Sequence, residues 1–557
     1  MKISCLISAF LCSIIVWAHA TTINAVYFAQ THVQKASDAY PTLVGDRDAL
    51  IKVHVTAPGA PASPAVKAQL SLAGNTTVLN LSGPPTLPPS IPDGPGVVQH
   101  SFNNTFTATI PKTWMKPGLT VSVTAGTAST NITNLNIGAP TKLIMTSANI
   151  HFFQQNIRDF GTGWETETWA KLPISSFEIH ETPDVVFSSL VVPPFEFGGV
   201  KKPAVRVVSK EDFKAQTGVD FDHDNSVSQR WNSALRSASG SQFYYSHSLY
   251  MLFKYNVTDK GVGGGFRGVT TRGTNARGVY LHELGHALSL PHWGEVVSNY
   301  PYKGAMFGVN PPAGITNGIH VGPTWGFDQA KRIFLPCTVQ AGNVGNKPTG
   351  TYKVDPMQGG GSGYQEPGFL FNHFSDYSAN QMRTYMENTV VVWNAALNSY
   401  AKWNNTTKGY TTTVPNNGRQ YPTIRNQSVI SVMAAVSAAS PNVNMVYPPI
   451  GPYNAGLIRP IDPANPTDRN AANTTYARIG GYDVTLRVTQ GGVARNYMLP
   501  VTYDPTANRL DAASLFTEAV NVPAANGAVT RVDLLLTPDA QINGLPANPQ
   551  VLSTWRL

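Results

Sequence analysis

The segment from Val279 to Glu295, VYLHELGHALSLPHWGE, constrains this chain more than any other stretch of its sequence. If the segment begins as a helix, His282 and His286 are one turn apart, so their rings project side by side from one face. Leucines three and four residues apart would bury the opposite face in a core. Pro291 cannot continue the helix, so the chain must turn there and can bring the ring of His292 back toward the first two.

Three imidazoles beside a glutamate are suited to a catalytic zinc ion, which takes three protein ligands and keeps a fourth position for water. We therefore predict one Zn²⁺ ion bound by His282, His286 and His292. Zinc lowers the pKa of its water to about 7 and polarises a carbonyl beside it, and Glu283 would act as the general base. Asp328 is an alternative third ligand. The simpler alternative is a core helix with histidines on its surface.

The amino terminus predicts export of the protein. Residues 1–20, MKISCLISAFLCSIIVWAHA, contain an early lysine, an apolar run and a terminal A-x-A pattern, which together are typical of a cleaved signal peptide. A membrane-spanning anchor is the alternative, but the apolar run is short for a bilayer. No later stretch is long and apolar enough to span one. We expect a secreted monomer without a transmembrane anchor and, because Cys337 is the single cysteine outside the signal, without an internal disulfide.

Composition narrows the classes of function and fold. Charged residues make up 13% of the 557 residues, while Gly (48) and Pro (42) are plentiful, which favours short strands and turns over long surface helices. The formal net charge of +8 comes from scattered Lys and Arg residues. No basic run interleaves with aromatic residues, so we expect no nucleic-acid partner.

The pattern along the chain predicts a multidomain α+β protein. After the signal peptide (1–20), residues 21–140 show short alternating runs typical of a β-sandwich-like domain. Residues 141–403 mix strand-like runs with two helical candidates, at 226–238 and 378–403, and contain the histidine motif. Residues 404–557 return to strand-like runs separated by Pro-rich turns, which predicts a C-terminal β-rich domain.

The histidine motif also resembles that of a known protein class. HELGHALSLPH is similar to the metzincin pattern HExxHxxGxxH and departs from it at Ser289, where metzincins have a glycine that allows a left-handed turn. Further segments look like those of the dictomallein family of secreted zinc metalloproteases, which includes bacterial mucin-cleaving enzymes. These segments are YFAQTHVQ…LVGDRDALIKV (27–53), GGGF (263–266), GPTWGFDQAKRIFLP (322–336) and DPMQGGG…SDYSANQM (355–382).

The resemblance implies a metzincin-like zinc protease domain flanked by β-sandwich-like domains. It implies that Met357 belongs to the methionine turn beneath the zinc, with Met306 as the alternative. Trp293 stands where relatives often have a tyrosine that supports the transition state, so Tyr377 is a second candidate for contacts with substrate or transition state. The segment GVGGGF (261–266) is either an edge strand along the cleft or a flexible loop.

Two functions from different classes follow from these observations. The first is a secreted zinc endopeptidase that hydrolyses peptide bonds in protein or glycoprotein substrates, with mucin-type O-glycosylated proteins as an expected substrate class. The second is a protease fold that has lost turnover and acts as an adhesion or glycan-binding module, an idea that rests on Ser289 and Trp293. DFDHDNS (220–226) opens like a calcium loop but lacks its glycine and glutamate, so we expect a solvated turn.

Overall fold

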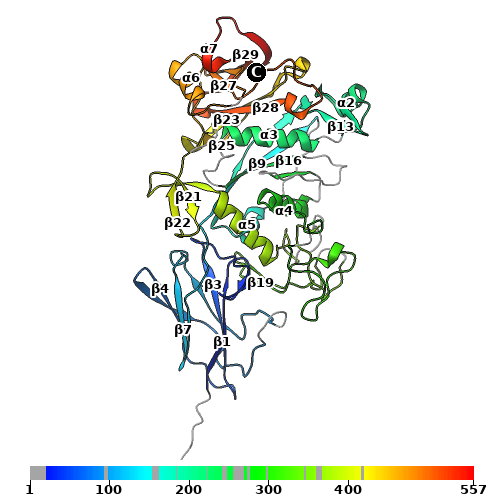
Figure 1. The fold of residues 1–557 in the computed structure, drawn as a ribbon. Coiled ribbons are helices and arrows are strands. Elements are labelled where there is room, and N and C mark those ends of the chain that lie inside the picture. The colour runs from blue at the N-terminus through cyan, green and yellow to red at the C-terminus, as the bar shows by residue number, and fades with distance from the viewer. Residues whose placement is uncertain are drawn as a thin grey trace, which may run out of the picture.

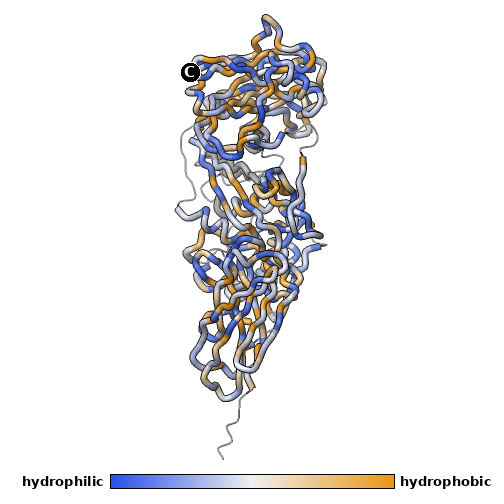
Figure 2. Tube along the Cα trace, turned by 90° about the vertical axis from the view of Figure 1, so that its left-hand side faces the viewer, coloured by the Kyte–Doolittle hydropathy of each residue, from blue (hydrophilic) through white to orange (hydrophobic). Residues whose placement is uncertain are grey.

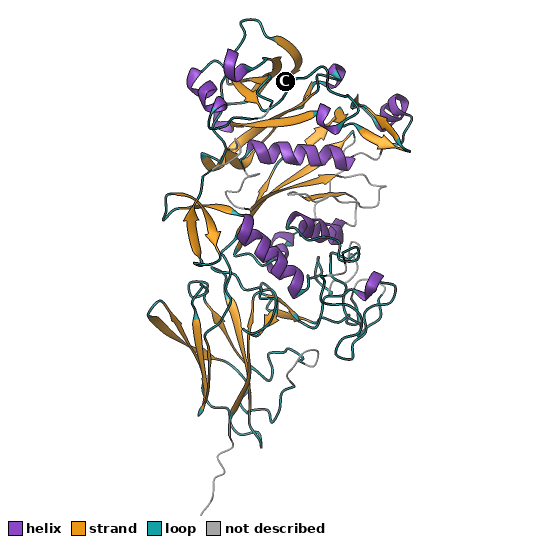
Figure 3. Cartoon of the chain, in the orientation of Figure 1, coloured by secondary structure: helices purple, strands orange, loops and turns teal. Residues whose placement is uncertain are grey.

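The structure is a computed structural model that describes residues 20–92, 98–153, 162–183, 185–221, 224–240, 247–254, 269–272, 276–296, 299–343, 347–358, 367–414, 420–478 and 480–557. Strands predominate, and the sheets stack in a column with the first strands at one end and the last strands at the other (Figures 1 and 3). The predicted signal peptide lies almost entirely outside the described residues. Within them, helices are all too short or too polar to cross a bilayer.

The first strands form two four-stranded antiparallel sheets, ordered β2-β1-β3-β6 and β5-β4-β7-β8. The two sheets share one hydrophobic core, because inward residues alternate with exposed ones, as in β4, where Val66, Ala68 and Leu70 are buried. The strands are β1 (Thr22–Ala29), β2 (Val33–Gln34), β3 (Ala49–Thr56), β4 (Val66–Leu72), β5 (Asn75–Leu81), β6 (Phe106–Ile110), β7 (Thr120–Ala125) and β8 (Ala128–Ile132).

A parallel sheet ordered β10-β9-β16-β17, with β11 also paired to β9, forms the middle of the molecule. Helix α3 lies on one side of this sheet, and α4 and α5 lie on the other (Figure 1). The elements are β9 (Lys142–Phe152), α1 (Trp164–Lys171), β10 (Ser176–Glu181), β11 (Val185–Phe187), α3 (Asp224–Ala238), β16 (His247–Lys254), β17 (Val269–Arg272), α4 (Ala276–Ala287) and α5 (Asp376–Thr389).

Smaller elements join the larger sheets. Antiparallel pairs form between β12 and β15, between β13 and β14 and between β18 and β19, and β20, β21 and β22 form a three-stranded sheet. Their bounds, with those of one short helix, are β12 (Leu190–Val192), β13 (Phe195–Phe197), β14 (Val200–Lys202), β15 (Val205–Val207), α2 (Lys210–Thr217), β18 (Gly326–Asp328), β19 (Ile333–Leu335), β20 (Val391–Asn394), β21 (Ser399–Asn404) and β22 (Gly409–Thr412).

The helix predicted over 378–403 is wrong in its second half. Helix α5 ends at Thr389, and the chain continues as strands β20 and β21. The run VVVW (390–393) explains the change, because β-branched residues lose side-chain freedom in a helix and pack well in a strand. The other predicted helix, over 226–238, corresponds to α3.

The last strands form two antiparallel sheets, one in which β23 pairs with β24, β25 and β28, and one ordered β27-β26-β29-β30. Their inward faces pack together in one core. The elements are β23 (Ile424–Val436), β24 (Met445–Val446), β25 (Ile450–Leu457), α6 (Pro466–Asn473), β26 (Val484–Gln490), β27 (Val493–Leu499), β28 (Phe516–Pro523), β29 (Val529–Leu536), α7 (Ala540–Asn543) and β30 (Gln550–Arg556). Figure 2 shows hydrophobic and hydrophilic residues interspersed along these end sheets.

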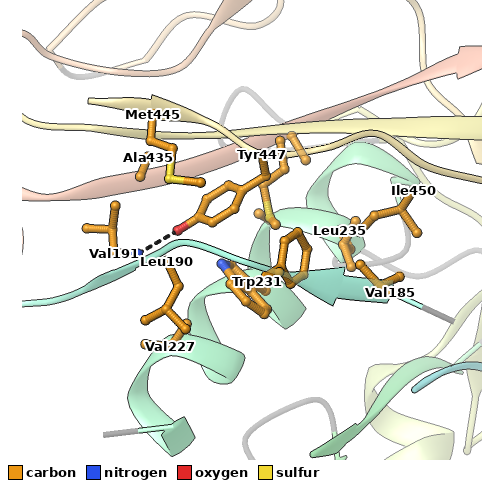
Figure 4. Close-up of a cluster of buried hydrophobic side chains, with 14 of the residues drawn as sticks. Val185, Leu190, Val191, Val227, Trp231, Leu235, Ala435, Met445, Tyr447 and Ile450 are labelled. Carbon is orange, nitrogen blue, oxygen red and sulfur yellow. Dashed lines mark hydrogen bonds between the residues drawn. The ribbon is translucent and has the colours of Figure 1, made fainter. Parts of the chain in front are cut away.

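One hydrophobic core joins two distant parts of the chain. Residues of α3 and of the strands from β11 to β15 pack against residues of β23, β25 and β28. In Figure 4, Trp231 of α3 and Tyr447 face each other, and the Tyr447 hydroxyl accepts a hydrogen bond from the backbone N–H of Val191 at 3.2 Å. Segments 185–238 and 429–519 therefore fold around a common interior.

The N-terminal sheets are attached to the central region by buried polar contacts. Arg47 is 1% exposed, and its guanidinium donates to the carbonyls of Leu172 and Ile174 at 2.6 and 3.0 Å while stacking on Trp169. His32, also 1% exposed, donates from Nε2 to the carbonyl of Phe374 at 2.9 Å. Both residues lie in the family-like segment 27–53. This segment therefore contributes contacts that join the N-terminal sheets to the central region.

Candidate metal centre

Helix α4 holds the first part of the histidine motif against the core. Leu281, Leu284 and Leu288 are completely buried, as the leucine spacing predicts. The chain then turns at Ser289, which has a φ of +78°. The N–H of Leu290 donates to the carbonyl of Gly285, and that of Ser289 to the carbonyl of His286, both at 2.9 Å. This pair of bonds is the Schellman arrangement, which ends a helix with one left-handed residue.

The turn brings three imidazoles together. The Nε2 atom of His282 lies 3.1 Å from that of His286 and 3.1 Å from that of His292, and the remaining separation is 2.9 Å. The residues offer a group of ligand atoms that could hold a metal ion. His282 is buried, whereas the side chain of His292 is 40% exposed, so the group is open to solvent on one side.

Each ring is oriented by an oxygen that accepts from its other nitrogen. His282 Nδ1 lies 2.8 Å from the carbonyl of Pro356, His286 Nδ1 lies 2.7 Å from the carbonyl of Leu290, and His292 Nδ1 lies 3.1 Å from the carboxylate of Glu295. A carbonyl or carboxylate only accepts, so these contacts place the hydrogen of each neutral ring on Nδ1. The three Nε2 lone pairs then face one another, an arrangement that a cation between them would stabilise.

The protonation of the rings agrees with this geometry. Burial lowers the pKa of His282 to about 4, against the opposing effect of the Pro356 carbonyl and with help from the two neighbouring histidines. Burial also lowers the pKa of His286. Both imidazoles are therefore neutral at neutral pH, as metal coordination requires. The separations of 2.9–3.1 Å come close to the roughly 3.3 Å between nitrogens that bind one tetrahedral zinc at about 2.0–2.1 Å.

Met357 lies directly beneath the helix that carries the first two histidines. It is completely buried, and a Cβ atom added to Gly285 would overlap its Sδ atom. Its carbonyl accepts from the N–H of Trp293 at 3.3 Å, which ties the methionine turn to the residue after the third histidine. Met357 therefore contacts the helix that carries the first two histidines, and its assignment to a methionine turn stays a prediction from the resemblance. Met306 is only partly buried and packs at the edge of the same core.

Asp355 fixes this turn to helix α5 and was missed by sequence reasoning. Its carboxylate is completely buried and accepts from the N–H groups of Met357 (2.9 Å) and Ser375 (3.0 Å) and from the hydroxyl of Ser378 (2.8 Å). Ser375 is in turn the N-cap of α5. An aspartate two residues before a methionine is common in loops, so no spacing rule singled it out.

Comparison with known proteins identifies the family. The peptidase M66 family model matches residues 97–391, which include the three histidines, Glu283 and Met357. The chain belongs to the peptidase M66 family. It is 28% identical to Dictomallein from Burkholderia mallei and from Burkholderia pseudomallei, over 95% of this chain and 83% of those proteins. It is 26% identical to Dictomallein-1 from Dictyostelium discoideum, over 76% of this chain and 74% of that protein.

Membership makes the protein a peptidase, whose substrates are proteins, and M66 peptidases are metallopeptidases. In this M66 peptidase Glu283 follows His282 in the same helical turn and is 4% exposed. Glu295, by contrast, is a surface residue whose carboxylate orients the ring of His292. Sequence reasoning missed this orienting contact, although the position of Glu295 three residues after His292 is compatible with it.

Other residues singled out from the sequence contribute no ligand atom to the histidine group. Trp293 is buried, and its indole N–H donates to Ser378 Oγ at 3.0 Å, inside the core. Tyr377 is partly buried and packs edge-to-face with Tyr40 and Tyr300. Asp328 lies in β18, 3.6 Å from the amino group of Lys171, and does not belong to the histidine group.

The remaining sequence features divide into structural residues and positions that are not described. Cys337 is buried, and burial raises the pKa of its thiol to about 11, so it is a poor nucleophile. His320 stacks on Tyr352 in the interior. The predicted edge strand or loop at 261–266 and the middle of DFDHDNS, at 222–223, lie outside the described residues.

Proposed function

We propose that this M66 peptidase is a secreted, zinc-dependent endopeptidase. The observation that carries the proposal is the convergence of three Nε2 lone pairs within 3.1 Å while each Nδ1 is held by an oxygen acceptor. In this proposal His282, His286 and His292 bind the ion and Glu283 is the general base. Imidazole nitrogens and one open side are typical of catalytic rather than structural zinc sites.

The chain's own residues then perform the proton transfers. A bound zinc ion would supply a Lewis acid that polarises the peptide carbonyl and lowers the pKa of a water molecule to about 7. Glu283 takes the proton of the attacking water and delivers it to the leaving amine. The carbonyls of Pro356 and Leu290 and the carboxylate of Glu295 keep the three rings in the required tautomer and orientation.

A metzincin-like fold of the catalytic unit supports the same proposal. Two features favour it: the left-handed turn at Ser289 before the third histidine, and the buried Met357 beneath the histidine helix. The departure from glycine at Ser289 therefore gives no ground for the alternative of an inactive adhesion module. Mucin-type O-glycosylated proteins remain the substrate class proposed from the resemblance.

A paired metal and activity measurement tests the proposal. The purified protein is expected to contain about one zinc per chain by elemental analysis, and a chelator should remove both the zinc and the cleavage of casein. Glu283→Gln should retain the zinc and lower kcat by about 10²-fold or more, because it cannot accept the proton. Glu196→Gln, the same change on the exposed strand β13, should alter neither.

Two outcomes would contradict the proposal. Undiminished casein cleavage by Glu283→Gln would exclude the assigned base, and a protein without stoichiometric zinc that cleaves in the presence of chelator would exclude the metal. Digestion of a mucin-type glycoprotein, with and without prior removal of its glycans, tests the substrate class. Export is tested by sequencing the amino terminus of the protein recovered from the medium, which should begin at Thr21.

A further inference from the structure

A pocket of about 500 Å³ lies away from the histidine group, where the central sheet meets the small sheet β20-β21-β22 and the start of β23. Its strand β10 is at the opposite edge of the central sheet from β17, the strand that leads into α4. The lining residues used in the argument are Lys142, Glu178, Val392, Trp393, Asn394 and Arg425.

The pocket runs along an open strand edge. Strand β20 pairs with β21 on one side, and in the described chain no strand pairs with its other side. Residues 392–395 all line the pocket. On a strand, alternate residues point to opposite faces, so a pocket lined by consecutive residues borders the backbone edge rather than one face. Such an edge offers N–H and C=O groups to an extended peptide.

The charges in the pocket favour an acidic ligand. The guanidinium carbon of Arg425 lies 4.1 Å from the centroid of the Trp393 ring. The guanidinium also hydrogen-bonds to the hydroxyl of Tyr400, and among the described residues it forms no ion pair with a carboxylate. Lys142 and Glu178 form an ion pair and largely neutralise each other. A guanidinium has five N–H donors, so those that are not bonded to Tyr400 can bind a carboxylate by two hydrogen bonds.

The aromatic wall around Arg425 is held in place by its neighbours. Trp393 packs edge-to-face against Tyr400 across the β20–β21 pair, with 5.3 Å between ring centroids. Tyr410, which also lines the pocket, packs edge-to-face against Trp403. A rigid aromatic surface beside a strand edge is suited to an extended chain with apolar and acidic side chains.

We propose that this pocket binds an extended acidic segment of a protein substrate, remote from the bond that is cut. The main chain of the segment adds to the open edge of β20, and a Glu or Asp side chain of the segment pairs with Arg425. The identification of the segment as part of a substrate rests on the proposed function, whereas the binding of an acidic peptide does not.

Direct binding tests the pocket without cleavage. The probe is a fluorescein-labelled peptide of about eight alternating Val and Glu residues, and its anisotropy is measured with the full chain carrying Glu283→Gln. Arg425→Gln in that background should weaken binding about tenfold or more, because a charge-assisted pair is lost. Arg509→Gln, the same change at an exposed position of the C-terminal region, should leave it unchanged.

A second variant, Asn426→Asp, keeps the proposal testable if Arg425→Gln fails to fold. Asn426 is exposed at the pocket, so Asn426→Asp should fold normally and lower the affinity by placing a negative charge beside Arg425. Replacing Glu by Gln throughout the probe should weaken binding as much as Arg425→Gln does. Equal affinity of the neutral and acidic probes, or binding of an acidic oligosaccharide in place of the peptide, would overturn the proposal.

Cleavage kinetics then separate this inference from the proposed function. For a peptide substrate joined to the acidic probe, Arg425→Gln in the otherwise unaltered chain should raise KM about tenfold with little change in kcat. The same substrate without the probe should be cut equally by both proteins. If the unaltered chain cleaves normally but Arg425→Gln does not change KM, the pocket proposal alone is overturned. If the unaltered chain binds the probe but cleaves no substrate, the proposed function alone is overturned.

Discussion

At the scale of single residues, Ser289 carries the conformational cost of the turn that returns His292 to the other two histidines. Its φ of +78° lies in the left-handed region, which a residue with a Cβ atom enters at a cost of about 1 kcal/mol. Ser289→Gly should therefore keep the turn and raise the free energy of unfolding by roughly 0.5–1 kcal/mol, measured by urea denaturation. Ser289→Ala, which retains the Cβ atom, is the control and should give no such gain.

Glu295 gives a second prediction at this scale. Because its carboxylate orients His292, Glu295→Gln should weaken zinc binding by about tenfold, at the low end for such contacts since Glu295 is 76% exposed. Competition with a chromogenic chelator measures the affinity, and Glu196→Gln is the matched surface control. Unchanged zinc affinity would show that His292 is held by the backbone turn alone.

The sequence predicted the residues of the histidine group but not the atoms that orient them. His282 and His286 follow from helical spacing, and His292 follows from the break at Pro291. Their acceptors at Pro356 and Leu290 are backbone carbonyls, and any residue supplies a carbonyl, so the sequence holds no signal for them. Trp293 stays a candidate for contacts with substrate or transition state, and the bond from its indole N–H to Ser378, 85 residues later, leaves no signal in the sequence.

At the scale of elements, the contact between α4 and the methionine turn leaves no room for a larger residue. Gly285→Ala would place a methyl group against Met357 Sδ and should destabilise the protein by about 1–3 kcal/mol. Met357→Ala creates space at the same point, so Gly285→Ala should cost much less in that background. Urea denaturation of the four proteins of this double-mutant cycle measures the coupling. Additive effects would mean that the two residues do not share the contact.

The strands were predicted better than the pairing between them. Alternating runs predicted strands within 21–140 and 404–557, where β4 and β26 lie, because burial of one face leaves a local pattern. The parallel order β10-β9-β16-β17 depends on contacts between segments up to a hundred residues apart, which local patterns do not encode. The open edge of β20 was not predicted either, because residues 378–403 were predicted as one helix and β20 lies within them.

At the scale of the whole molecule, the junction between the N-terminal sheets and the peptidase unit should be sensitive to acid. Burial lowers the pKa of His32 to about 4, against the effect of its bond to Phe374. The unfolded chain gains a proton below about pH 6.5 that the folded chain does not accept until about pH 4. The stability contributed by neutral His32 is therefore complete above pH 6.5 and falls by about 3 kcal/mol as the pH drops to 4.

Replacing His32 isolates this effect. The glutamine of His32→Gln can still donate to the Phe374 carbonyl but does not titrate. The free energy of unfolding of this variant should therefore fall less steeply between pH 6.5 and 4.5 than that of the unaltered protein, with a difference in slope of up to about 1.4 kcal/mol per pH unit. Denaturation curves of both proteins across that range provide the measurement. His320 and His373, whose pKa values burial also lowers, continue to contribute to the slope in both proteins. Parallel slopes would contradict the assignment.

The common interior of residues 185–238 and 429–519 has a consequence for how the polypeptide is made. Helix α3 is synthesised about 190 residues before β23 begins. At about 5–20 residues per second, the hydrophobic face of α3 therefore stays exposed for roughly 10 to 40 s before β23 can pack against it. Until then Trp231 and its hydrophobic neighbours form an exposed surface on the nascent chain that other chains can bind. Aggregation should therefore begin during translation, and stop codons placed before β28 should yield insoluble products even though every histidine of the motif is already present.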